Sequence, residues 1–261
     1  MYLLYFLVSL IASTIGGICG VGGGVIIKPV LDATGTMSVT NISFLSGCTV
    51  LSMSIISVLR SSKNKGVLDI RVSTTLAIGG IIGGVFGKTL FDLLKEILEN
   101  ENHLGAVQAV LLTIITVGTL IYSIYSKKIK TNKVNSIMIC LLIGIFLGMV
   151  STFLGIGGGP INLTVLFFFF SMDTKKAAAN SLYVIMFSQL ASLVQTVIKG
   201  NVPPVSISVV LLMVTAGVLG GIIGGRINKK ISSNVVDKLF IGFMIVIIGI
   251  STYNVLKFTI L

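Results

Sequence analysis

The chain has 261 residues, of which 54% are hydrophobic and 10% are charged, and its mean hydropathy is +1.06. These values exclude an ordinary soluble domain and are typical of a helical protein that crosses a membrane several times. The net charge of +11 does not indicate nucleic-acid binding, because the basic residues lie in short clusters between apolar runs, as they do in cytoplasmic loops. We therefore expect the lipid bilayer, and no nucleic acid, as a partner.

Two long apolar runs, 3–31 and 136–171, each contain a glycine-rich interruption. Three shorter runs follow each of them, and each shorter run suits one crossing: 38–59, 72–87 and 104–125 in the first half, and 177–198, 205–225 and 235–256 in the second. The halves 1–133 and 134–261 thus match element by element. This order predicts two repeats.

Both interruptions have the sequence G-[VI]-G-G-G, and the two copies lie 135 residues apart. The glycines concerned are Gly20, Gly22, Gly23 and Gly24 in the first copy and Gly155, Gly157, Gly158 and Gly159 in the second. Each glycine costs roughly 1 kcal/mol relative to alanine inside a helix, so the motif predicts that one helix ends and another begins. Pro160 follows the second copy, where proline suits the first position of a helix.

A helix that begins after such a motif directs unpaired N–H groups and a partial positive charge back towards the break. At membrane depth, an irregular backbone is tolerated only where protein or a watery cavity receives it. Close packing of helices is the alternative role for a single glycine. Because the triplet occurs in both halves, we predict that the eight motif glycines frame an anion-binding site.

The length of the second long run predicts its path. As one helix, residues 136–171 would reach about 54 Å, whereas the hydrocarbon core of a bilayer is about 30 Å thick. A helix and a half-helix that return to their starting side form a re-entrant hairpin instead. With both long runs as hairpins, four loops share one side and carry fourteen of the nineteen basic residues: 60–71, 127–135, 172–176 and 226–238. Eight single crossings give no such asymmetry, so the positive-inside rule favours hairpins.

Each half then crosses the membrane three times, so the second half enters it upside down. We therefore predict an all-α membrane protein, a polytopic helical bundle of two inverted repeats. Each repeat consists of a Gly-broken re-entrant hairpin followed by three transmembrane helices. Inverted repeats with discontinuous helices are the organisation of many secondary transporters.

Small polar residues form a stripe on the helix that follows each break. In the second half the stripe contains Ser181, Ser188, Ser192 and Gln195, and a shift of 138 residues places Ser43, Ser54 and Ser57 opposite Ser181, Ser192 and Gln195. Such residues either bond a neighbouring helix or line a polar path, and their presence in both halves favours the path. Asn41 and Asn180, at the start of these helices, are either caps or ligands.

Charged residues are rare inside the runs. Lys28 is the one charge within a predicted hairpin, and it either contacts the anion or extends to the outer surface. The acidic residues, Asp32 among them, stand at the ends of runs or in loops, which disfavours a carboxylate site for a cation. The three cysteines have no metal or disulfide spacing. We expect no metal, no cofactor and no catalytic residue, and thus no enzyme.

On these residues the chain resembles the sulfite exporter TauE/SafE family of bacterial membrane transporters. The resemblance rests on G-x-G-G-G in each half, on Pro29 and Leu31 after the first copy, and on later G-x-x-x-G runs. It implies a multi-pass protein of the bacterial plasma membrane that moves sulfite, organosulfonates or related sulfur anions.

Taken together, the residues and the resemblance predict a secondary transporter of small anions that uses alternating access. A passive anion channel and a transporter of an unrelated small carboxylate are the alternatives. Assembly into a homo-oligomer is left open.

Overall fold

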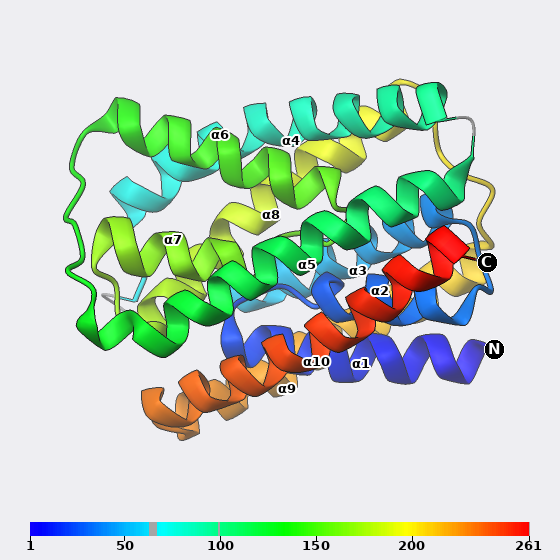
Figure 1. Ribbon diagram of the computed structural model, residues 1–261. Coiled ribbons are helices and arrows are strands. Elements are labelled where there is room, and N and C mark those ends of the chain that lie inside the picture. The colour runs from blue at the N-terminus through cyan, green and yellow to red at the C-terminus, as the bar shows by residue number, and fades with distance from the viewer. Residues whose placement is uncertain (63–66, 99, 261) are drawn as a thin grey trace.

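Helices make up every regular element in the part of the chain that the computed structural model describes, which is residues 1–62, 67–98 and 100–260. The basic positions 63 and 65 of the predicted loop 60–71 lie outside the described residues. The elements, shown in Figure 1, are α1 (Tyr2–Cys19), α2 (Gly24–Thr34), α3 (Val39–Ser61), α4 (Ile70–Leu98), α5 (Glu101–Tyr125), the short 3-10 helix η1 (Ser126–Lys128), α6 (Ile137–Phe153), α7 (Pro160–Phe170), α8 (Thr174–Ile198), α9 (Ile207–Lys230) and α10 (Ser233–Ile260).

Seven of the described helices are long and apolar enough to cross a membrane: α1, α3, α4, α5, α8, α9 and α10. The helix α6 has 17 residues, and α2 and α7 have 11 each. Large apolar side chains point outward from the bundle, for example Ile114 and Ile121 on α5 and Val246 on α10. Lipid would cover such a surface. The chain is a multi-pass helical membrane protein.

The glycine motifs separate α1 from α2 and α6 from α7, as the sequence predicts. Gly20 ends α1 in the left-handed conformation with φ of 79°, and Gly155 has φ of 64° just after α6. Residues with a Cβ rarely adopt this conformation, so glycine is required where each helix must stop sharply. Pro160 is the first residue of α7.

Hydrogen bonds join the entrance and the exit of each broken pair. The hydroxyl of Tyr5 near the start of α1 donates to Thr36 Oγ1, just beyond α2, at 3.0 Å. The backbone N–H groups of Asn132 and Val134, which precede α6, donate to the carbonyls of Phe168 and Phe169 at the end of α7. The chain therefore leaves α2 and α7 beside the points at which it enters α1 and α6.

Helices of the two halves interleave in the bundle. The helix α1 packs on α9 and α6 packs on α4, along the bottom and the top of Figure 1 respectively. Similarly, α3 packs on α9 and α8 packs on α4, while α3 meets α8 and α5 meets α10. Exchanging the halves leaves this set of contacts the same. Most of the core thus depends on contacts between the halves.

Glycines in α4 and α9 allow the closest of these contacts. A Cβ on Gly83 of α4 would lie 2.0 Å from the carbonyl oxygen of Ile145 in α6. A Cβ on Gly224 of α9 would lie 2.3 Å from the carbonyl oxygen of Thr14 in α1. These distances leave no room for a side chain, so the G-x-x-x-G runs serve helix packing.

The helix α4 is longer than the predicted span 72–87, because it continues to Leu98. Its last part is rich in Leu, Lys and Glu, which favour helix even where the apolar pattern ends. Lys88 and Asp92 support this part through an ion pair of 2.8 Å between positions four apart. The predicted acidic loop consequently lies mostly within the ends of α4 and α5.

Candidate functional site

The two breaks meet each other in the middle of the bundle. A Cβ on Gly22 would lie 3.0 Å from the carbonyl oxygen of Gly157, and a Cβ on Gly24 would lie 2.2 Å from that of Ile156. Gly22 and Gly157 both have positive φ, 73° and 65°. A side chain at these positions would push the breaks apart, so the motif brings backbone against backbone.

The third and fourth motif glycines also pack tightly, although the two breaks differ in conformation. Gly23 has φ of −70° and faces Ser13 of α1. Its counterpart Gly158 has φ of 116°, and a Cβ there would lie 2.3 Å from Ile185 Cδ1 of α8. The starts of α2 and α7 are thus closely surrounded by protein, and neither has a side-chain cap.

Each break also contacts the first turns of a helix from the other half. A Cβ on Gly20 would lie 2.2 Å from Ala178 Cα in α8, and a Cβ on Gly155 would lie 2.7 Å from Ser43 Oγ in α3. Positions 43 and 178 have the same 135-residue offset as the glycines. This offset pairs Ser46 with Ser181, whose buried hydroxyls both lack a partner, and replaces the 138-residue offset that the serine pattern indicated.

A pocket of about 40 Å³ lies beside the second break, between α3, α4 and α8. Of the predicted site residues it is lined by Ser43, Gly155 and Ser192, and it also contains Thr152 and Gln189. Ser43 Oγ, Thr152 Oγ1 and Gln189 Nε2 are buried and have no hydrogen-bond partner. Because an unpaired buried polar group costs about 1–3 kcal/mol, this concentration indicates a place for a polar ligand.

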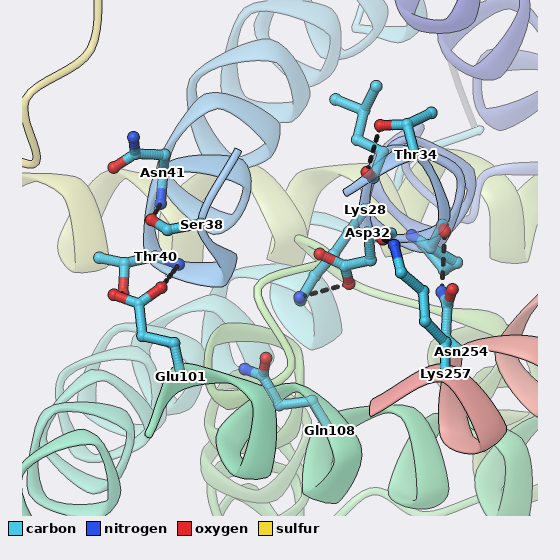
Figure 2. Close-up of polar contacts among 12 residues, drawn as sticks. Lys28, Asp32, Thr34, Ser38, Thr40, Asn41, Glu101, Gln108, Asn254 and Lys257 are labelled. Atoms are coloured by element: carbon cyan, nitrogen blue, oxygen red, sulfur yellow. Dashed lines mark hydrogen bonds and ion pairs between the residues drawn. The ribbon is translucent and has the colours of Figure 1, made fainter. Parts of the chain in front are cut away.

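A wider vestibule of about 540 Å³ adjoins this pocket and shares with it the residues Thr40, Lys88, Asn201 and Pro203. Asn41 lines the vestibule, with its backbone N–H bonded to Ser38 Oγ. Thr40 Oγ1 donates to Glu101 at 2.9 Å, which joins the start of α3 to that of α5 (Figure 2). The pocket therefore opens towards the end of the bundle where α3 and α5 begin.

Three other predicted site residues lie away from the pocket. Asn180 Oδ1 accepts from Asp69 N and from Ser73 Oγ, and its Nδ2 donates to the carbonyls of residues 67 and 176, so this amide anchors the start of α4 to α8. Gln195 bonds Thr89 Oγ1 of α4 at 3.0 Å. Ser54 donates to a carbonyl of its own helix. These side chains serve helix contacts in this conformation.

Lys28 lies in neither of the two places that the sequence suggested. Its Nζ is 2.8 Å from Asp32 Oδ2, and the side chains are 3% and 7% exposed. The expectation that Asp32 is a surface residue at the end of a run is thus wrong: the last turn of α2 is covered by α10 (Figure 2), from which Lys257 donates to the carbonyls of Asp32 and Ala33. The charge pair is buried because tertiary packing closes over a helix end.

A polar pocket buried among membrane-spanning helices, beside two broken helices, is the arrangement found in membrane transport proteins. The family model for sulfite exporter TauE/SafE matches residues 5–251, nearly the whole chain. The chain belongs to the sulfite exporter TauE/SafE family, a family of membrane transporters. The comparison with curated proteins found no match, and the comparison with solved structures found none either.

Proposed function

We propose that this protein is a secondary transporter of small sulfur oxyanions, sulfite or an organosulfonate, in the bacterial plasma membrane. The observation that carries the proposal is the set of unpartnered groups in the pocket beside the second break. Ser43, Thr152 and Gln189 each offer at least one hydrogen-bond donor to this space. Family membership supports sulfur anions as the class of substrate.

Charge in the pocket favours an anion over a cation. Lys88 is the one charged residue among the described residues that line it, and no carboxylate is among them. The oxygens of a sulfite or sulfonate group accept hydrogen bonds and donate few or none, which suits hydroxyls and an amide N–H. The proposed binding residues are thus Ser43, Thr152, Gln189 and Ser192, with Gly155 allowing close approach.

The relation between the halves supports alternating access as the mechanism. We propose that 1–133 and 134–261 are inverted repeats and that both broken helix pairs are re-entrant. The exchangeable contacts between the halves, and the bonds that join the entrance and exit of each pair, agree with this proposal. Gly155 lines an open pocket, whereas Gly20 is packed against Ala178. Exchanging these two environments would open the site to the opposite side.

Flux into proteoliposomes tests this function. We expect saturable uptake of labelled sulfite that an organosulfonate inhibits and acetate does not, with faster uptake when the vesicles are preloaded with unlabelled sulfite. Stimulation by internal substrate is expected of a carrier, because the loaded form returns faster than the empty one. Flux without saturation or such stimulation would indicate a channel instead, and preference for acetate would indicate a carboxylate transporter. Protein-free vesicles are the control.

A further inference from the structure

A second polar cavity, of about 10 Å³, lies between α2, α5 and α10. It is lined by the buried pair Lys28 and Asp32 and by Gln108, Ser251 and Asn254. These five residues are between 1% and 6% exposed. The cavity shares no lining residue with the pocket proposed for the anion.

Four oxygens at this cavity have no hydrogen-bond partner: Asp32 Oδ1, Gln108 Oε1, Ser251 Oγ and Asn254 Oδ1. Hydrogen bonds elsewhere hold both amides in this orientation. Gln108 Nε2 donates to the carbonyl of Phe153 at 2.5 Å, and Asn254 Nδ2 donates to that of Pro29 at 2.8 Å. Figure 2 shows Gln108 and Asn254 on either side of the Lys28–Asp32 pair. Turning either amide would break its bond to a helix carbonyl, so the oxygens stay with the cavity.

A cavity with several unpaired acceptors suits a cation. One carboxylate, two amide oxygens and a hydroxyl are the hard oxygen ligands that alkali and alkaline-earth ions prefer. The volume corresponds to about one water molecule, so the occupant is a single small ion or a single water. A single carboxylate beside the Lys28 ammonium does not balance a divalent ion, which leaves a monovalent ion of small radius.

We propose that this cavity binds one sodium ion in competition with the proton of Lys28. Lys28 Nζ lies 2.8 Å from Asp32 Oδ2, while Oδ1 of the same carboxylate is unpartnered. The pair is neutral as it stands, and a sodium ion beside a charged ammonium would leave one buried positive charge uncompensated, which is strongly unfavourable. Sodium therefore enters as Lys28 releases one proton to water, so that the charge of the site is unchanged.

The other titratable groups near this pair leave that exchange to Lys28. Lys257 of α10 donates to the carbonyls of Asp32 and Ala33, where it stabilises the negative end of α2. Tyr5 of α1 is bonded to Thr36 beyond the end of α2. The part of α5 that lines the cavity contributes Gln108 and apolar residues. The proposal concerns a site separate from the anion pocket, and binding can be measured without any flux.

Thermal unfolding of the purified protein in detergent tests the proposal. The chain has no tryptophan, but a fluorogenic thiol reagent reports unfolding because its three cysteines are buried or half-buried. At equal ionic strength we expect sodium chloride to raise Tm above the values in potassium and choline chloride, since a ligand of the folded state stabilises it. The rise should be larger at pH 9 than at pH 6. Titration of a weakly buffered sample with sodium should release close to one proton per ion bound.

Variants separate the ion from its competitor. Ser251→Ala removes one ligand from an otherwise unchanged helix, and we expect sodium affinity to fall about tenfold. Lys28→Met removes the competing ammonium, so sodium should bind more tightly at pH 6 and its effect on Tm should lose its pH dependence. Asn228→Ala is the matched control, because Asn228 also donates to a helix carbonyl, that of Ile18, but does not line the cavity.

Equal Tm values in sodium, potassium and choline, in the wild type and in Lys28→Met, would overturn the proposal and assign the cavity to a water molecule. Sodium binding without proton release, or with the same pH dependence in Lys28→Met, would overturn the competition. Loss of the sodium response in Asn228→Ala as large as that in Ser251→Ala would show that the response reports general stability.

Discussion

Replacing Gln189 by leucine tests whether the pocket beside the second break binds an anion. Gln189 is 3% exposed, and its Nε2 has no partner in the absence of a ligand. Leucine fills a similar volume and removes only the polar group. A hydrogen bond to a charged ligand contributes about 1.5–3 kcal/mol, so sulfite affinity should fall roughly 10- to 150-fold.

The same substitution should leave the stability of the ligand-free protein unchanged or raise it. An unpaired buried amide costs about 1–3 kcal/mol, and Gln189→Leu removes that cost. Affinity and stability are thus expected to change in opposite directions. This combination separates a binding role from a structural one, because loss of a structural hydrogen bond would lower both.

Sulfite titration by calorimetry and thermal unfolding of the same samples give the two quantities. Gln195→Leu is the matched control: Gln195 lies on the same helix, bonds Thr89 and does not line the pocket. It should lose some stability and keep its sulfite affinity. An unchanged dissociation constant in Gln189→Leu, or an equal loss in both variants, would refute the assignment of the pocket.

Three further predictions concern topology, the motif and a structural amide. In intact cells, cysteines introduced at Lys130 and Lys175 should both resist an impermeant thiol reagent, because a re-entrant pair returns the chain to the cytoplasmic side; labelling of one position alone would contradict this. Gly158→Leu should abolish sulfite flux with the protein still inserted, since its φ of 116° and the 2.3 Å approach to Ile185 leave no place for a side chain; wild-type flux would remove this glycine from the mechanism. Asn180→Leu should lower stability by about 2–4 kcal/mol, because several buried hydrogen bonds lose their partner, and an unchanged melting temperature would argue against its anchoring role.

Local properties of the sequence were enough to predict the class of protein and the position of each break. Apolar runs indicate membrane helices because burying backbone groups in lipid requires helix and apolar side chains over about twenty residues. The glycine motifs mark the ends of α1 and α6 because a left-handed residue at such an end requires almost no side chain. Both signals lie within a few residues of the structure that they predict.

The composition of the pocket depended on the tertiary structure instead. In a soluble protein, polar and apolar faces of a helix show which side is buried, but a membrane helix is apolar towards both lipid and core. The stripe of serines therefore could not distinguish Gln189, which lines the pocket, from Gln195, which faces α4. An amide in the middle of an apolar span was the one local signal that could have identified Gln189.

Sequence alone determined that the chain is a helical membrane protein with two glycine-broken helices, because helix propensity and hydropathy act over short stretches. Only the tertiary structure decided that Thr152 and Gln189 meet Ser43, and that Lys28 and Asp32 are buried together. These contacts join residues of different helices, and the pocket brings together both halves of the chain. They depend on which helix faces pack together, and the breaks and the close-packed glycines set that packing across the whole bundle.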